Sequence, residues 1–422
     1  MRPGLVRAAG GVRTALGAAA LSIMLAGTPA CAFQADDPAA SRAAAATALR
    51  TGRYDDALAR LQRLAALPAG DAQARAADRR QLLRTLLTVG HYEEAERLAR
   101  QYVAEPDGAL VATAAGEVLL ARGKAGDAEP LLARAATGAP DSLTARLRLA
   151  ELRLARGDRA AAMRDFDAFI DVYRNAQGRL TSEQLAAVAG ALRHLGRANP
   201  QLYKDALRVY DEAVAADSAN LDARVRLGEL FLEKYNGPEA ASTLGAVLRV
   251  NPRHPAALVA AARQAYEAGE GDPRALLRRA LETNPDYPPA HALLARLALD
   301  LEDHATARAE AERALTVDPA EAEALAVLAA THHFGGDAAG FDAVRRRAEA
   351  QGLAAADFYV TLADLSARSR LYADAVTFAG RAVAVDSAAA RALALLGVNL
   401  LRTGDAAAAR QALEAGFARD PY

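Results

Sequence analysis

The sequence is poor in the residues that most often stabilise extracellular and β-rich proteins. Its 422 residues include one cysteine, no tryptophan and 5% aromatic residues. A single cysteine excludes an intramolecular disulfide, and the shortage of aromatic side chains argues against a sheet. Alanine supplies much of the 52% hydrophobic content. Because alanine is the strongest helix former, the composition favours closely packed helices.

Lysine and catalytic motifs are also scarce. The formal net charge is −1, and the only lysines are Lys124, Lys204 and Lys234. Nucleic acid, which requires a basic surface, is therefore not an expected partner. The chain contains no HExxH, GxxxxGK[ST] or GxSxG phrase, so no catalytic residue, metal ligand or cofactor site is predicted. We interpret the pair His332-His333 as solvated or groove-lining, because adjacent helical residues point about 100° apart and cannot both face one metal ion well.

The N-terminus has the pattern of a secretory signal peptide over residues 1–32. Three arginines precede an uncharged apolar stretch, "ALGAAALSIMLAG", which is short for a membrane span, and "ACA" then fits cleavage after Ala32. Cleavage would leave a periplasmic or secreted protein without its only cysteine, and would move the net charge to about −4. Lipidation of Cys31 is a less favoured alternative, because Thr28 stands where such sites prefer an aliphatic residue. No later stretch is long and apolar enough to span a membrane.

An internal repeat organises the rest of the chain. Asp or Asn followed by Pro or Ser recurs at Ser218, Pro252, Pro285, Pro319, Ser387 and Pro421, with separations of 34, 33, 34, 68 and 34. Each interval contains two amphipathic helical patterns, such as "ARVRLGELFLEKY" followed by "PEAASTLGAVLRV". Neither helix can bury its apolar stripe alone, so the units must stack on one another.

The unit resembles the tetratricopeptide repeat (TPR). The resemblance implies an all-α, right-handed superhelical solenoid of stacked antiparallel helix pairs, with about eleven units over residues 38–422. It also implies packing roles for the turn, the small residues of both helices and the closing proline, which in this sequence are Tyr54, Ala57, Tyr92, Ala95, Gly228, Ala240, Pro252, Pro285, Ala314, Pro319, Gly397 and Pro421.

The repeat is less regular in the first half of the chain. We expect an irregular array over residues 33–200 and a regular array over 201–422, with about five extra residues in "GRANPQLYKDA" at the junction. The chain ends on "FARDPY", which resembles the start of a further unit. We expect Leu413 and Phe417 to be partly exposed there, either because the sequence is a fragment or because this end packs on another copy.

The resemblance implies a protein–protein interaction scaffold that binds a protein or an extended peptide in its concave groove, without catalysis. TPR phasing points Val225, Glu229, Leu232 and Arg296 into that groove. The C-terminal half is also similar to secreted bacterial TPR proteins that continue into a peptidase-MA-like metallopeptidase domain. The alternative function is therefore a non-catalytic arm of such an enzyme, and self-association through the C-terminal repeat is a further possibility.

Overall fold

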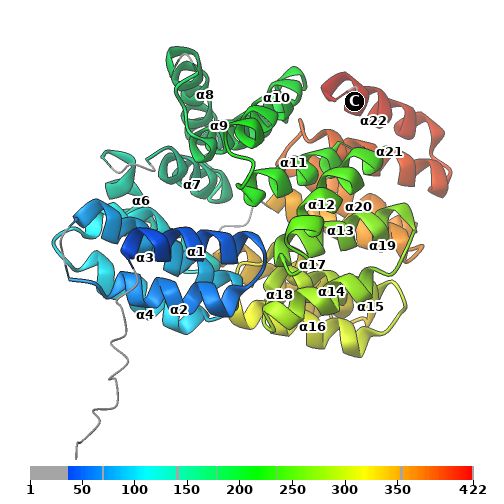
Figure 1. Cartoon of the computed structure of the whole chain (residues 1–422). Helices are drawn as coiled ribbons and strands as arrows, with labels where there is room; N and C mark the ends of the chain where they lie inside the picture. Colours follow the sequence, from blue (N-terminus) through cyan, green and yellow to red (C-terminus); the bar gives the residue numbers. More distant parts are fainter. Residues whose placement is uncertain are drawn as a thin grey trace, which may run out of the picture. The chain divides into compact units, whose positions relative to one another are not determined.

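The computed structural model describes residues 37–68, 71–138, 142–176, 178–234, 236–351 and 355–420. Within these ranges the chain forms twenty-two α-helices and one short 3-10 helix, and it contains no strand (Figure 1). The all-α fold of about eleven helix pairs is confirmed. The predicted cleavage site at Ala32, Cys31 and the last closing proline, Pro421, lie outside the described residues.

We number the helix pairs as units 1 to 11 and call the two helices of each unit helix A and helix B. The bounds of units 1 to 5 are α1 (Pro38–Arg50) and α2 (Tyr54–Ala65), α3 (Ala72–Thr88) and α4 (Tyr92–Val103), α5 (Ala112–Ala121) and α6 (Ala125–Ala136), α7 (Ser142–Ala155) and α8 (Arg159–Ala176), and α9 (Ser182–Gly196) and α10 (Gln201–Ala216). The 3-10 helix, Gly108–Val111, precedes α5.

The C-terminal units are more uniform in length. The bounds of units 6 to 11 are α11 (Leu221–Glu233) and α12 (Gly237–Val250), α13 (Pro255–Ala268) and α14 (Pro273–Thr283), α15 (Pro288–Leu299) and α16 (His304–Val317), α17 (Ala322–Phe334) and α18 (Ala338–Ala350), α19 (Ala355–Arg368) and α20 (Tyr372–Val385), and α21 (Ala390–Thr403) and α22 (Ala406–Arg419).

Local sequence explains where these helices begin. The side chains of Asp303, Asp337 and Asp405 each accept a hydrogen bond from a backbone N–H in the first turn of a helix B. Such caps satisfy donors that the helix itself leaves unpaired. α9 begins with a full capping box between Thr181 and Gln184.

Small residues set the spacing between helix A and helix B. A Cβ added to Gly228 would lie 2.8 Å from Leu244, and one added to Gly397 would lie 2.5 Å from Leu413. Of the expected packing residues, the structure buries Tyr54, Ala57, Tyr92, Ala95, Gly228, Ala240, Ala314 and Gly397. The closing prolines differ, because Pro252 and Pro285 are exposed and Pro319 is half-buried.

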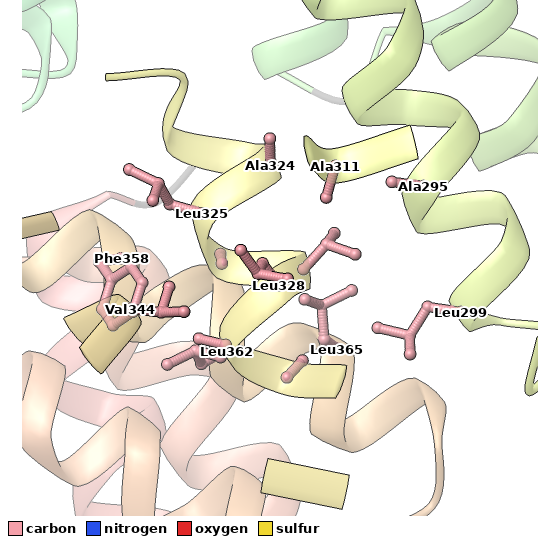
Figure 2. Packing of buried hydrophobic residues seen from close by; sticks show 14 of the residues in the cluster. Ala295, Leu299, Ala311, Ala324, Leu325, Leu328, Val344, Phe358, Leu362 and Leu365 are labelled. Carbon is pink, nitrogen blue, oxygen red and sulfur yellow. The ribbon is translucent and has the colours of Figure 1, made fainter. Parts of the chain in front are cut away.

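Helix A of an internal unit is packed between the helices of the preceding unit and those of the next one. Figure 2 shows this for α17, whose Leu325 and Leu328 point into a cluster with Leu299 of α15 and with Phe358 and Leu362 of α19. All five side chains are at most 4% exposed. The core is therefore a continuous row of inter-unit clusters.

The chain also makes contacts between units far apart in sequence. The Nδ2 atom of Asn251, at the end of α12, donates to the Leu49 carbonyl at 3.2 Å and to the Tyr54 hydroxyl at 3.0 Å. The Nδ2 atom of Asn284, at the end of α14, donates to the Leu87 carbonyl at 3.1 Å and to the Tyr92 hydroxyl at 2.8 Å. The residues that follow helix B in units 6 and 7 are therefore hydrogen-bonded to the turns between the two helices of units 1 and 2.

A third contact of this kind joins units 3 and 8. A Cβ added to Gly123 would lie 2.7 Å from Pro319 and 3.2 Å from Asp318. Residues Pro38–Tyr422 form one compact unit, and α9 packs closely on α10. The expected boundary between the irregular and the regular array, at residue 200, falls between the two helices of unit 5. The division into two arrays stays a prediction.

Two glycines offer a matched test of the contact between units 1 and 6. Gly52 and Gly157 both have a positive φ, of 76° and 85°, so alanine is strained at either position by about 1–2 kcal/mol. A Cβ at Gly52 would also lie 2.4 Å from Asn251 Oδ1, whereas nothing lies within 4 Å at Gly157. We predict that Gly52→Ala lowers the free energy of unfolding by about 1–3 kcal/mol more than Gly157→Ala in urea titrations. Equal losses would show that the inter-unit contact contributes nothing.

Asp318 stands where units 6 and 7 carry asparagine, and its burial raises the pKa of its carboxyl to about 6 from 3.8. The folded state therefore binds this proton more tightly than the unfolded state, and stability is lost as the pH rises through that window. We predict that Asp318→Asn stabilises the protein by about 1–2 kcal/mol above about pH 7 and by much less near pH 4. Chemical denaturation at both pH values measures this, with the exposed Asp286→Asn as the control. An equal gain at both pH values would contradict the assignment.

Candidate functional site on the inner face of the A helices

Helix A of each unit from α3 to α19 contacts helix A of the next unit, whereas successive B helices in the described part of the chain hardly touch. The A helices are therefore closer together, so they form the inner side of the stack. A groove in a solenoid of this kind would be lined by helix A side chains.

One position of helix A carries a charged residue in most units. It directly follows the small or apolar residue that packs on helix B, such as Gly116, Gly228 or Ala295. We call this the ladder position. From unit 2 onward, with the irregular unit 5 left out, it holds Arg84, Glu117, Glu151, Glu229, Arg263, Arg296, Ala330, Asp364 and Val398.

In the first half of the chain the ladder residues are linked from unit to unit. Arg84 lies 3.5 Å from Glu117, and Arg148 of unit 4 lies 3.4 Å from Glu117 and 2.8 Å from Glu151. Glu151 continues the series to His194 Nε2 of unit 5, at 3.2 Å. Units 2, 3 and 4 are thus joined by alternating charges, and His194 extends the series to unit 5.

Unit 5 connects this series to distant units as well as to its neighbour. Arg84 donates to Glu183, at the start of α9, at 2.7 Å, so units 2 and 5 meet across the inner face. Arg193 lies 2.5 Å from Glu233 and 3.9 Å from Glu229 of unit 6. Ion pairs between neighbouring units therefore line the inner face, and the Arg84–Glu183 pair joins two distant units across it.

In the second half two arginines share one carboxylate. Arg263 lies 2.5 Å and Arg296 3.2 Å from Glu323 of unit 9. Arg296 also pairs with Asp364 of unit 10. Burial opposes ionisation of Glu323, but the two guanidinium groups outweigh it and lower the pKa of Glu323 to about 2. The carboxylate is therefore charged at every physiological pH.

The structure places the four expected groove residues in two different environments. Val225 and Leu232 are 3% and 9% exposed and belong to the cluster between units 6 and 7. Glu229 and Arg296 occupy the ladder position, where the Glu229 side chain is 39% exposed and that of Arg296 is 7% exposed. Only Glu229 among the four therefore offers a partner substantial side-chain surface.

Sequence reasoning missed most of the ladder. It singled out Glu229 and Arg296 but not Arg84, Glu117 or Glu151, although the same signal marks all five. That signal is a charged residue after the small or apolar helix A residue, recurring every 33 or 34 residues in the regular units. It cannot be read without correct phasing of the irregular units.

The histidine pair has partners within the protein. His332 Nδ1 lies 2.8 Å from Asp337, and His333 Nε2 lies 3.1 Å from Asp374. The His333 ring also lies edge-on to Phe378, with ring centroids 5.0 Å apart. Across the described ranges, no three His, Cys, Asp or Glu side chains are grouped as metal ligands. No helix there is long and apolar enough to cross a membrane.

Comparison with known proteins supports the repeat assignment. Family models described as tetratricopeptide repeat match residues 119–171, 201–265 and 288–321. This chain therefore contains tetratricopeptide repeats. A protein from Komagataeibacter xylinus, cellulose synthase 2 operon protein C, is 37% identical over 125 residues, which is 29% of this chain and 10% of that protein.

Solved structures match this chain at low sequence identity and with low TM-scores. Human IFIT1, in a structure described as a dimer with PPP-AAAA, is 14% identical with a TM-score of 0.44 over 89% of this chain and 99% of that one. A tetratricopeptide repeat protein from Parabacteroides merdae is 16% identical with a TM-score of 0.37 over 60% of this chain and 93% of that one.

The ladder predicts unequal effects of two substitutions. Arg296→Ala removes a buried cation from Glu323 and Asp364, and we expect it to destabilise the protein by about 3–5 kcal/mol. Glu229→Ala removes a half-exposed carboxylate whose nearest guanidinium nitrogen is 3.9 Å away, so we expect a loss below about 1 kcal/mol. Urea unfolding of both variants measures the difference.

A double variant separates the charge from the packing in this prediction. Arg296→Met together with Asp364→Leu replaces the pair by apolar side chains, which is often nearly neutral for buried ion pairs. We therefore expect the double variant to be more stable than Arg296→Ala alone. A double variant that is equally unstable would mean that neither the lost volume nor the unpaired Asp364 explains the effect, and would point to the ion pair of Arg296 with Glu323.

Proposed function

We propose that this protein is an interaction scaffold whose inner helix A face binds an extended peptide segment of a partner protein. The observation that supports this most directly is the ladder, a charged position that recurs on successive A helices. Arginine and carboxylate side chains offer hydrogen-bond donors and acceptors of fixed geometry. A peptide in extended conformation presents backbone groups and side chains along its length that such a series can pair with.

The ladder favours specificity over raw affinity. Its charges are paired within the protein, as in the link from Arg84 to Glu117 at 3.5 Å. A partner must therefore replace existing ion pairs with equivalent ones, and a segment with the wrong charge pattern leaves a charge unpaired. The half-exposed side chain of Glu229 is the best placed to make the first contact.

Peptide display tests this proposal. Extended peptides selected on the full chain should lose at least about tenfold in affinity when Glu229→Lys reverses one ladder charge. Glu312→Lys makes the same change at an exposed position of helix B in unit 8 and should leave the affinity unchanged. Equal affinities for both variants would place the peptide site elsewhere.

We further propose that the protein works outside the cytoplasm, in the periplasm or secreted. The support is the sequence of residues 1–32, with three arginines before an uncharged apolar stretch and a small-residue cleavage site. N-terminal sequencing of the protein from a cell envelope fraction tests this. A mature chain that begins after Ala32 supports it, and an intact Met1 in a cytoplasmic fraction contradicts it.

A second candidate function is the non-catalytic recognition arm of a longer enzyme. It is favoured by the length of the Komagataeibacter xylinus protein, of which the matched stretch spans 10%, and by the similarity to repeat proteins with a metallopeptidase domain. The coding sequence downstream of Tyr422 decides this candidate. An open frame that encodes HExxH on a helix would support it, and a stop codon would remove it.

A further inference from the structure

The residue that follows helix B meets an earlier unit with two side-chain atoms, and each atom has its own role. In unit 6, Oδ1 of Asn251 accepts from the backbone N–H two residues later at 3.1 Å, and Nδ2 donates to Tyr54 of unit 1 at 3.0 Å. In unit 10, Oδ1 of Asp386 accepts in the same way at 3.0 Å, and Oδ2 pairs with Arg159 of unit 4. One atom therefore holds the local turn, and the other contacts the earlier unit.

The earlier unit supplies a side chain that suits this second atom. It comes from the residue two positions after a glycine of positive φ, and the pairs are Gly52 with Tyr54, Gly90 with Tyr92, and Gly157 with Arg159. A tyrosine hydroxyl accepts from the amide of Asn251 or Asn284. A guanidinium instead balances the carboxylate of Asp386. The two sides of each contact are thus matched in charge.

The contact between units 3 and 8 has no such partner. Oδ1 of Asp318 accepts from the Ala320 N–H at 2.9 Å, so Oδ2 takes the place of Nδ2 in Asn251. The turn of unit 3 has Gly123, with a φ of 65°, and two positions later Ala125, which offers neither a hydroxyl nor a cation. Among the described residues, the Ala320 N–H is the only hydrogen-bond donor to this carboxyl.

The backbone of the unit 3 turn presents an acceptor to the same atom. Asn251 and Asn284 each donate to the carbonyl three residues before the turn glycine. In unit 3 that carbonyl belongs to Leu120, and it accepts from the Gly123 N–H at 2.9 Å, as its equivalents do in units 1 and 2. An ionised carboxylate has no hydrogen to donate to a carbonyl, whereas a protonated carboxyl has one. Protonation therefore makes Asp318 equivalent to the two asparagines.

The cations nearest in sequence to the unit 3 turn glycine are engaged elsewhere. Arg122 and Lys124 lie 3.5 Å and 2.5 Å from Glu96 of α4. Neither of them forms an ion pair with Asp318, whose burial is compensated only by the backbone N–H of Ala320. The carboxyl is therefore costly to ionise in the closed contact.

Three further titratable groups surround Asp318. Burial raises the pKa of Tyr92 on α4, and it raises the pKa of Glu321 to about 8, so both stay mainly neutral up to pH 7. Glu323 of α17 is paired with two arginines of the ladder, which lower its pKa to about 2. Asp318 is thus the group of this contact that changes charge between pH 5 and pH 7.

We propose that the contact between units 3 and 8 is a pH-sensitive clasp, which is closed when the protonated carboxyl of Asp318 donates to the Leu120 carbonyl and which loosens when that carboxyl is ionised. Asn251 and Asn284 hold units 1 and 2 at either pH, because an amide does not titrate in this range. Burial raises the pKa of Asp318 to about 6 from 3.8. The clasp is therefore most stable in acid and weakens as the pH rises through 6.

The clasp bears on the proposed peptide site. Units 3 and 8 contribute the ladder residues Glu117 and Arg296 to the inner face. Loosening of the clasp would let these two parts of the inner face move relative to each other, so acid would tighten the groove. This effect on a bound peptide rests on the proposed function, whereas the clasp itself does not.

Hydrogen exchange of the full chain at pH 5 and pH 7, without any peptide, tests the clasp. The measured quantity is the protection of backbone N–H groups, corrected for the intrinsic exchange rate at each pH. Protection of the unit 3 turn, residues 119–128, should fall about tenfold from pH 5 to pH 7, because a proton bound with a pKa of about 6 when closed and 3.8 when open favours closure by that factor. The unit 1 turn, residues 48–57, is held by Asn251 and should keep its protection.

Two variants separate the charge of Asp318 from other effects of pH. Asp318→Asn installs the amide of units 6 and 7, so the unit 3 turn should be equally protected at both pH values. Ala125→Arg installs the cation that unit 4 has at this position, and Ala125 lines a cavity of about 510 Å³ that has room for it. This variant should keep its protection at pH 7, because the guanidinium balances the ionised carboxylate.

Several results would overturn the proposal. Equal protection of the unit 3 turn at both pH values in the unmodified protein would show that the contact does not respond to the proton. A tenfold fall that persists in Asp318→Asn, or that appears equally at the unit 1 turn, would assign the effect to another group. Because exchange is measured without peptide, failure of the proposed function would leave this result unchanged.

Discussion

No helix pair of this chain can bury its own apolar surface, and the rest of the structure depends on this constraint. Each unit presents an apolar face that only the next helix A can cover, as Val225 and Leu232 show against Ala257 and Ala260. Because the contact between neighbouring units repeats along the chain, residues at the same repeat position pack in the same way in successive units. Stability is then close to a sum of units and junctions.

Two consequences follow from this regularity. The residue at the ladder position is charged in seven of the nine units compared, with Ala330 and Val398 as the exceptions. The turns of the early units also meet the closing segments of units five further along, through Asn251 and Asn284. The inner face is therefore both charged and held in place by contacts between distant parts of the chain.

The sequence was sufficient to predict the helix pairs, their number and the small residues between them, because period and residue size are local properties. Tyr54 and Tyr92 were correctly assigned to buried positions. Their hydrogen bonds to Asn251 and Asn284 could not be predicted, because nothing in a 34-residue period states which distant unit a turn will meet. Val225 and Leu232 show a second limit. They were expected in the groove but lie buried between units 6 and 7, because a small rotation of helix A moves a side chain from the groove to the contact between units.

The predicted exposure of Phe417 agrees with the structure, since the side chain is 69% exposed.

The arrangement of the two halves of the repeat array depends most on the contact between units 1 and 6, where Asn251 Nδ2 donates to the Tyr54 hydroxyl at 3.0 Å. The most direct test is a distance measurement by electron paramagnetic resonance between spin labels at Arg53→Cys and Arg253→Cys, in a chain with Cys31→Ser. Both positions are exposed. The account predicts a short and narrow distance distribution that is lost in denaturant. A long and broad distribution in the folded protein would contradict it.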